Sequence, residues 1–174
     1  MTLPPARATQ ADLFRLLDAL AIAHETRAHA PLFTVEQART ALAVVPGART
    51  KNLFLADRRG TLLLVSALED TAIDLKALAR HLGLLRFSFG SAETLREVLG
   101  VEPGSVTPFA LMNDHLGRVR VLLDRKLLEA PLVNFHPLTN DASTALAPSG
   151  LMAFLAHVKH EPLIVSFGEI NEDD

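Results

Sequence analysis

Three short stretches carry residue types that could do chemistry at one site. Lys51 lies in Thr50-Lys51-Asn52, where a polar segment enters an apolar run and an ammonium can face a pocket at the mouth of a strand. A glycine and a proline bracket residues 104–108, and such a tight loop can point backbone N–H groups at a carbonyl or carboxylate oxygen. His136 precedes Pro137 at the end of an expected strand, where an imidazole can orient a substrate.

Each of these stretches also has an ordinary structural explanation. Lys51 can be a solvated residue at a strand end, the loop a plain connector, and His136 a histidine that the fold itself satisfies. No phosphate-binding, dinucleotide-binding, zinc-protease or nucleophile-elbow motif is present. His157 and His160 are three positions apart, but no carboxylate is placed to complete a metal site with them. We therefore expect a reaction without a metal or other cofactor.

The composition bounds the class of protein. The chain has 174 residues, 49% of them hydrophobic and 21% charged, which is typical of one globular domain. The formal net charge of -3 disfavours broad binding to duplex DNA, although a few Arg or Lys side chains could still contact one RNA end. The first residues lack the features of a signal peptide, the longest apolar run (62–65) is too short to span a bilayer, and cysteine is absent. We expect a cytoplasmic protein with no membrane partner.

Capping signals and apolar periodicity predict the elements that position the three stretches. The sequence indicates N-caps at Thr9 and Ser149, a capping box at Thr34-x-x-Gln37, and C-caps at Gly83 and Gly100. Helices are expected at residues 9–20, 34–42, 74–82, 92–99 and 149–159. Strands are expected at residues 24–29, 52–56, 61–66, 86–89, 109–112, 119–124, 132–135 and 163–167.

The order of these elements predicts an α/β (α+β) fold. Residues 57–60 close a hairpin, residues 113–117 form a turn, and most strand neighbours are close in sequence. This pattern favours a mixed, largely antiparallel sheet with helices packed around it. We expect residues 1–174 to form one domain with a core at about 9–167, followed by a mobile acidic segment at 169–174.

Taken together and in order, these stretches resemble the YbaK/ProX superfamily of aminoacyl-tRNA deacylases, which includes the editing domain of bacterial prolyl-tRNA synthetases. The resemblance covers about residues 13–167. Its landmarks are Thr50-Lys51-Asn52-Leu-Phe-Leu55, Gly83-Leu84, Phe89-Gly90, Gly104-Ser-Val-Thr-Pro108-Phe-Ala-Leu111, Val121-Leu-Leu-Asp124 and Asn134-Phe-His-Pro-Leu138. The Lys-Asn-Leu-Phe-Leu version is similar to the free-standing branch that clears alanine from tRNA-Pro.

The resemblance implies a barrel-like sheet surrounded by helices, no metal, and a site on named positions. Lys51 matches the essential lysine of the family, His136 its pocket histidine, and Asn52 lies beside the lysine. The loop that matches the Gly-x-x-x-Pro motif consists of Gly104, Ser105, Val106, Thr107 and Pro108. The implied partners are the acceptor end of mischarged tRNA-Pro and prolyl-tRNA synthetase, and the implied selectivity is exclusion of proline by size.

Three alternatives remain at this point. The substrate could be Cys-tRNA-Pro or another small aminoacyl-tRNA, the enzyme could act on a different small aminoacyl ester, or the fold could serve as a non-catalytic nucleic-acid-binding module. The sequence contains no recognition helix or aromatic RNA-binding motif, which disfavours the last alternative. Candidate tRNA contacts are the basic clusters Arg58-Arg59, Arg80 with Arg86, and Arg118 with Arg120.

Overall fold

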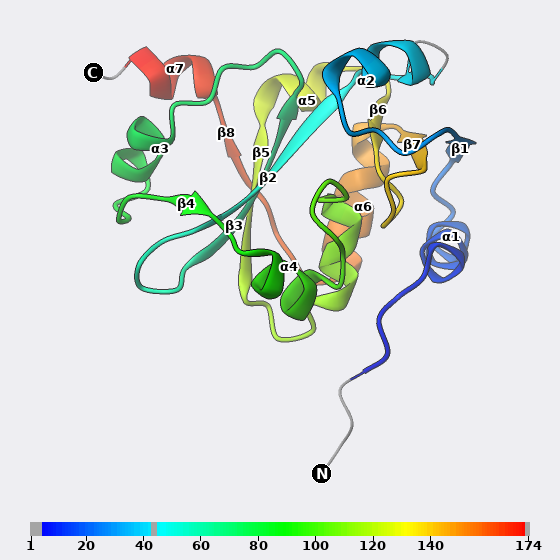
Figure 1. Ribbon diagram of the computed structural model, residues 1–174, viewed down its shortest axis with the longest axis horizontal. Helices are drawn as coiled ribbons and strands as arrows, with labels where there is room; N and C mark the ends of the chain where they lie inside the picture. Colours follow the sequence, from blue (N-terminus) through cyan, green and yellow to red (C-terminus); the bar gives the residue numbers. More distant parts are fainter. Residues whose placement is uncertain (1–4, 43–44, 173–174) are drawn as a thin grey trace.

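Two β-sheets, with helices packed around them, make up the computed structural model, which describes residues 5–42 and 45–172 (Figure 1). The helices are α1 (Gln10–Ala19), α2 (Val35–Leu42), α3 (Leu75–His81), α4 (Ala92–Leu99), η1 (Pro108–Asn113, a 3-10 helix), α5 (Arg125–Glu129), α6 (Pro148–His157) and α7 (Phe167–Glu172). The strands are β1 (His24–Ala28), β2 (Thr50–Ala56), β3 (Leu62–Leu68), β4 (Ser88–Phe89), β5 (Val119–Asp124), β6 (Val133–Phe135), β7 (Ala142–Leu146) and β8 (Leu163–Val165).

The larger sheet is mixed and the smaller one is antiparallel. The larger has the order β4-β2-β3-β5-β8, in which β2 pairs antiparallel with β3 and β4, whereas β3, β5 and β8 run parallel. The smaller has the order β1-β7-β6. The sheets meet just before β2, where Ala48 pairs with Val133 and the Thr50 hydroxyl donates to the carbonyl of Asn134. The predicted mixed, largely antiparallel fold with surrounding helices is therefore confirmed.

The larger sheet buries both of its faces, and alternate residues of β2 and β3 belong to different clusters of the core. Phe54 and Leu64 pack in the cluster that also contains Phe135 of β6. Leu55 and Val65 pack in the cluster that also contains buried residues of α3 and α7. Because side chains alternate across a strand, neighbouring residues of β2 face different sides of the sheet.

Several of the predicted capping and turn residues form the hydrogen bonds that the sequence indicated. Thr9 forms a capping box with Asp12 at the start of α1. The amide N–H of Gln37 donates to the Thr34 hydroxyl at the start of α2, while the Gln37 side chain accepts from the N–H of Phe33. Between β2 and β3, Asp57 accepts hydrogen bonds from two backbone N–H groups of the turn. These local bonds satisfy backbone donors that helix ends and tight turns otherwise leave free.

The strand predicted at residues 109–112 is wrong, because these residues belong to η1. Thr107 caps this 3-10 helix and its hydroxyl accepts from the N–H of Phe109, 3.3 Å away. Pro108 occupies the first turn, where its missing N–H costs nothing. The apolar run is therefore buried as a short helix.

The C-terminal part of the chain also departs from expectation. Residues 167–172 form α7, in which Phe167 and Ile170 are buried, so the expected mobile segment is wrong for residues 169–172, while 173–174 lie outside the described residues. Asn171 joins α7 to α3, since its amide donates to the carbonyl of Ala72 and its oxygen accepts from the N–H of Asp74. The predicted last strand ends at residue 165, before α7 begins.

Three smaller features differ from the sequence-based expectation. Helix α6 begins at Pro148 rather than after Ser149, and no side chain caps it. Strand β7 and helix α5 were not predicted.

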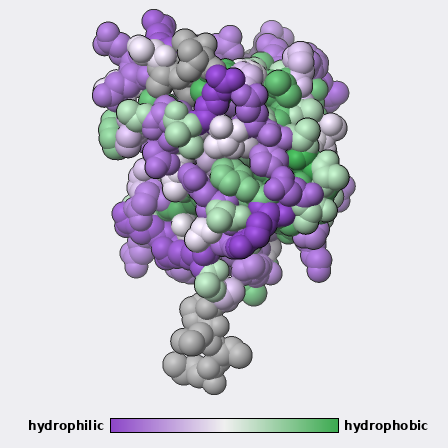
Figure 2. Space-filling model, turned by 90° about the vertical axis from the view of Figure 1, so that its right-hand side faces the viewer, coloured by the Kyte–Doolittle hydropathy of each residue, from purple (hydrophilic) through white to green (hydrophobic). Residues whose placement is uncertain are grey.

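In the described part of the chain, no helix is long and apolar enough to cross a membrane. The face that carries α1 and β1 shows hydrophobic residues in small groups among hydrophilic ones (Figure 2).

Candidate functional site

The 104–108 loop presents backbone N–H groups that have no internal use. Gly104 has a φ of 88°, a left-handed conformation that favours glycine. The N–H of Ser105 donates to the carbonyl of Glu102. The N–H groups of Gly104, Val106 and Thr107 find no acceptor among the described residues, and Pro108 has none to offer. Such a cluster of free donors can stabilise an oxyanion or hold a carbonyl oxygen.

His136 is held as a neutral imidazole. Its Nδ1 lies 3.0 Å from the carbonyl oxygen of Ala142 and donates to it, so the proton resides on Nδ1 and Nε2 is left as an acceptor. Burial of the ring lowers the pKa of His136 below its ordinary value of 6.5, and the neighbouring His29 lowers it further. The Ala142 carbonyl and Asp141 oppose these effects only in part.

His29, at the end of β1, belongs to the same cluster and was not singled out by the sequence. Its ring centroid lies 6.2 Å from that of His136. Nδ1 of His29 donates to the carbonyl of Ala30, and Nε2 lies 2.9 Å from the Ser143 hydroxyl, from which it accepts. A histidine directly before Ala30-Pro31, at a strand end, was the available signal.

Asn140 links the 104–108 loop to the turn after His136. A Cβ placed on Gly104 would lie 3.6 Å from the amide nitrogen of Asn140, which donates to the carbonyl of Leu32 over 2.8 Å. A cavity of about 340 Å³ lies there, with Ser105, Leu138 and Asn140 in its wall. The structure therefore brings the loop, the His136 turn and the segment after β1 into one neighbourhood.

Lys51 reaches a different set of partners. Its Nζ donates to the carbonyl of Thr71, whose hydroxyl in turn donates to the buried carboxylate of Asp124, 3.1 Å away. Lys51 pairs with Ala67, a residue of the cluster that α3 and α7 share. Within the described residues, no contact joins its ammonium to His136 or to the loop. Its backbone, however, follows Thr50, which is bonded to the carbonyl of Asn134.

Asn52 lies on the face of β2 opposite to Lys51. Its side-chain oxygen accepts from the buried hydroxyl of Ser66, 2.6 Å away, on the paired strand β3. This face of the sheet is the one whose apolar residues pack with Phe135, the residue before His136. Asn52 therefore faces the core that contains Phe135, on the side of the sheet away from Lys51. His136 follows Phe135, and side chains alternate along a strand, so this packing does not place the His136 ring beside Asn52.

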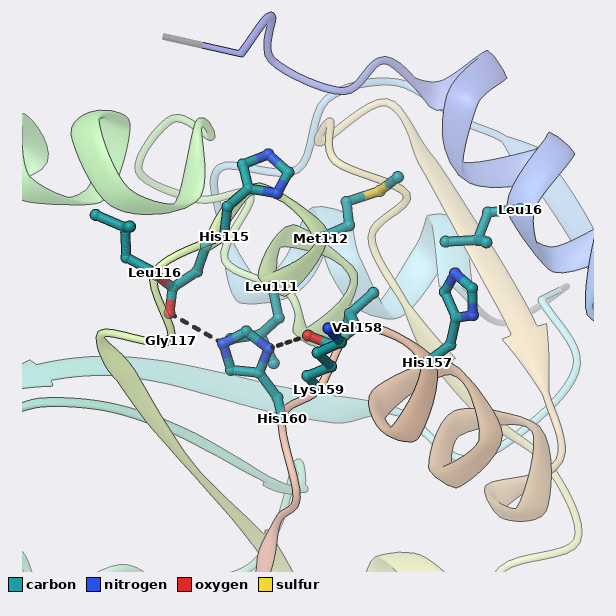
Figure 3. A pocket seen from close by; sticks show the side chains of 11 residues that line it. Leu16, Leu111, Met112, His115, Leu116, Gly117, His157, Val158, Lys159 and His160 are labelled. Atoms are coloured by element: carbon teal, nitrogen blue, oxygen red, sulfur yellow. Dashed lines mark hydrogen bonds and ion pairs between the residues drawn. The ribbon is translucent and has the colours of Figure 1, made fainter.

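A separate cavity of about 520 Å³ lies between η1, the loop before β5 and the end of α6 (Figure 3). His160 is buried at its wall, with Nδ1 bonded to the carbonyl of Val158 and Nε2 3.0 Å from the carboxylate of Asp114. His157 lies beside Leu16, away from His160. The two histidines do not converge, and no group of three or more metal-ligating side chains occurs in the parts of the chain that the structure describes.

The candidate tRNA contacts differ in their availability. Arg58, Arg59 and Arg120 are exposed. Arg118 forms an ion pair with Glu97, with 2.6 Å between the guanidinium and the carboxylate, which neutralises part of its charge. The exposed arginines are thus the better candidates for contacts with phosphates.

Comparisons with known proteins identify the family of the chain. Residues 29–154 match the family described as aminoacyl-tRNA editing domain. The Bos taurus prolyl-tRNA synthetase associated domain-containing protein 1 is 39% identical over 165 residues, covering 91% of this chain and 95% of that protein. The prolyl-tRNA editing protein ProX of Acetoanaerobium sticklandii is 35% identical over 132 residues, covering 75% of this chain and 80% of that protein.

A solved structure shows the same fold. It is described as a candidate trans-editing enzyme for prolyl tRNA synthetase and superimposes with a TM-score of 0.68 at 21% identity, over 92% of this chain and 98% of the other. The matched range contains Lys51, the 104–108 loop and His136. The chain therefore belongs to the family of aminoacyl-tRNA editing domains of the YbaK/ProX type.

Proposed function

We propose that the chain is a trans-acting hydrolase that removes the amino acid from mischarged tRNA-Pro, with Ala-tRNA-Pro as its main substrate. Family membership carries the proposal, and the name of the ProX relative points to prolyl-tRNA editing. Water attacks the carbonyl carbon of the aminoacyl ester, the bond to the ribose oxygen breaks, and the amino acid and the free tRNA leave. Prolyl-tRNA synthetase is the proposed partner that supplies the mischarged tRNA, because the Bos taurus relative is named after that enzyme. The cytoplasm is the proposed location.

The 104–108 loop supplies the oxyanion donors in this proposal. The tetrahedral intermediate carries a negative oxygen, which the free N–H groups of Gly104, Val106 and Thr107 can stabilise without reorganisation. One donor of this kind contributes about 3–4 kcal/mol to lowering the barrier. Ser105 and Pro108 hold the loop shape, since Ser105 is bonded back to Glu102 and Pro108 begins η1.

His136 and Asn52 would shape the end of the pocket that receives the amino acid. A neutral imidazole with a free Nε2 can accept a hydrogen bond from the substrate ammonium or from a ribose hydroxyl. Asn52, whose side-chain oxygen accepts from Ser66, has an amide nitrogen that can donate to the substrate. The ribose hydroxyl next to the ester, rather than a side-chain base, is the proposed activator of the water.

Lys51 would supply positive charge to the terminal phosphate or to the ester. In the structure its ammonium is bound to the carbonyl of Thr71, so the proposal requires the side chain to leave that carbonyl when substrate arrives. Lysine has a long flexible side chain, and Thr50, the residue before Lys51, is bonded to the carbonyl of Asn134.

Size would provide the selectivity between alanine and proline. A missing methylene changes attraction by only about 1–3 kcal/mol, whereas overlap with a ring that does not fit can be much more costly. A pocket that admits alanine and overlaps with proline acts as a second sieve after the synthetase.

The test is a deacylation panel with purified protein. Ala-tRNA-Pro, Cys-tRNA-Pro, Ser-tRNA-Ala and Pro-tRNA-Pro are incubated with the enzyme, and release of the amino acid is followed. We expect fast release only from Ala-tRNA-Pro. Fast loss of correctly charged Pro-tRNA-Pro would contradict size exclusion, and binding without release from any substrate would favour a non-catalytic module.

Variants of Lys51 and of a distant lysine test the assignment of the ammonium. Lys51→Met should lower deacylation at least about tenfold, since a lost charge contact in a site contributes more than about 1.4 kcal/mol. Lys76→Met, at the exposed start of α3, is the matched control and should keep the wild-type rate. Full activity of Lys51→Met would remove Lys51 from the mechanism.

A further inference from the structure

Phe33 is the most exposed phenylalanine among the described residues, with 81% of its surface accessible. It lies between β1 and α2, four positions after His29, whose ring contacts that of His136. A large apolar side chain in water is unfavourable by itself, and exposed aromatic residues beside a site commonly serve binding. The exposed ring of Phe33 is therefore a candidate for ligand binding.

The peptide group between Leu32 and Phe33 is held at both of its polar atoms. Its N–H donates to the side-chain oxygen of Gln37 over 3.0 Å, and the carbonyl of the preceding Leu32 accepts from Asn140 over 2.8 Å. Asn140 is the residue that lies against Gly104. The segment that presents Phe33 is thus tied to the turn after His136 and to the 104–108 loop.

A groove is lined by residues on both sides of Phe33 in the chain, 30–32 and 34, and by residues of α2, while the Phe33 ring itself lies outside its wall. Its volume is about 500 Å³, and Pro31, which also lines the smaller cavity near Ser105, joins the two hollows. The only charged group in its wall is Glu36, and the other polar groups are those of Thr34, Gln37 and Thr40. A wall with one carboxylate and no cation disfavours a phosphate and leaves hydrogen-bonding groups for the edge of a base.

We propose that Phe33 is the stacking platform for the adenine of the terminal adenosine of the bound tRNA. The inference rests on the proposed function, because the ester that the enzyme would cleave is on the ribose of that nucleoside. In this proposal the ester carbonyl lies at the 104–108 loop, the amino acid lies near His136, and the adenine extends towards Phe33 past Pro31, which lines the same cavity as Ser105. Stacking on an aromatic side chain holds a base without needing charge.

Intrinsic fluorescence tests the contact without any catalysis. The chain has no Trp and no Tyr, so Phe33→Trp introduces the only strongly fluorescent side chain. Phe89→Trp is the matched control, since Phe89 is 68% exposed but lies in β4, at the other side of the molecule (Figure 1). We expect uncharged tRNA-Pro to quench the indole of Phe33→Trp and to leave that of Phe89→Trp unchanged.

The terminal base is varied in the same experiment. A tRNA-Pro that lacks only the base of its last nucleotide should bind without quenching the indole of Phe33→Trp. Equal quenching by the intact and the baseless tRNA would overturn the proposal. Absence of any response to intact tRNA at saturating concentration would overturn it too, and would leave an interaction with a protein partner as the use of Phe33.

Kinetics with Phe33→Ala and Phe33→Leu give the second test. Both variants should raise KM for Ala-tRNA-Pro about tenfold with little change in kcat, because stacking contributes to binding and leucine has no aromatic face. On the baseless substrate, wild type and variants should have the same KM. Unchanged KM in Phe33→Ala would refute the stacking role. If wild-type protein deacylates nothing, the proposed function fails, whereas the fluorescence experiment still decides whether Phe33 binds the base.

Discussion

At the scale of single residues, His136 owes its protonation state to its surroundings. The bond from Nδ1 to the Ala142 carbonyl fixes the tautomer, and burial with the nearby His29 keeps the pKa of His136 below 6.5. In the unfolded chain the same side chain would titrate near its ordinary value. Because the pKa of His136 differs between the folded and the unfolded chain, the stability of the fold should depend on pH.

The free energy of unfolding should fall as the pH is lowered from about 8 to about 5. Below the ordinary pKa of histidine the unfolded chain takes up a proton that folded His136 still refuses, because its pKa is lowered. His136→Asn, whose amide can still donate to the Ala142 carbonyl, should show a smaller fall. Urea unfolding at several pH values measures it, and an equal fall in both proteins would contradict the assignment.

Gly104 supports a second prediction at this scale. Gly104→Ala and Gly117→Ala should each lower the free energy of unfolding by about 1–2 kcal/mol, because both glycines have positive φ angles of 88° and 63°. A Cβ on Gly117 meets nothing within 4 Å, and one on Gly104 meets only Asn140 at 3.6 Å, so the cost is backbone strain in both.

Deacylation should separate these two variants. Gly104→Ala should lose at least about tenfold in rate, since a small shift of the loop misaligns its N–H groups. Gly117→Ala should keep the wild-type rate. Thermal unfolding and single-turnover deacylation measure the two effects, and equal rates would exclude the loop from the reaction.

The sequence could indicate residue types but not their orientation. Lys51, His136 and the 104–108 loop are recognisable from their ordered motifs, yet the strand alternation that turns Lys51 towards Thr71 depends on the register with Ala67. Asn140 carries no local signal, and His29 carries only its position before Ala30-Pro31, because their roles arise from contacts with Leu32 and His136, distant in the chain. Non-local contacts of this kind are invisible in a short window of sequence.

At the scale of elements, the predicted caps at Thr9 and Thr34 act at helix starts, whereas the predicted cap at Ser149 does not. Thr9, Ser91 and Asp74 each accept a backbone hydrogen bond at the start of a helix, as their types favour. The run after Pro108 is as apolar as a strand, but its cap at Thr107 makes it a 3-10 helix. Residues 142–146 are small and polar in part, so burial against β1 and β6, not propensity, makes them a strand.

Helix α7 yields a prediction about stability. Phe167→Ala should lower the free energy of unfolding by about 3–5 kcal/mol, because Phe167 is fully buried between the sheet and α3 and its loss leaves a cavity. Phe89→Ala, at an exposed position, should change it by less than about 0.5 kcal/mol. Urea unfolding distinguishes them, and similar values for both variants would mean that α7 does not pack on the core in solution.

At the scale of the whole molecule, the acidic balance limits how the protein can hold RNA. With a net charge of -3, broad contact with the phosphate backbone is unfavourable, so the exposed arginines and the base at the acceptor end must provide the contacts. The affinity for tRNA-Pro should therefore fall only gently with salt, with a log–log slope that corresponds to about two or three released counterions.

Fluorescence titration of the Phe33→Trp variant at several salt concentrations measures this slope. A steep dependence would show that many phosphates are neutralised and that the binding surface extends well beyond the acceptor end. Arg120→Gln and Arg59→Gln, both at exposed positions, would then show which arginine contributes phosphate contacts, because removing such a contact reduces the salt dependence of the affinity.

The parallel pairing of β8 with β5 has a consequence for the order in which the protein folds. Leu163, Ile164 and Val165 join the edge of a strand that was synthesised some forty residues earlier, and α7 follows them directly. Until these residues have paired, β5 has one open edge and the side of the sheet that carries Lys51 lacks the cover of α7. Closing this edge is therefore a late step of folding, and deacylase activity should appear only once β8 and α7 have docked on the sheet.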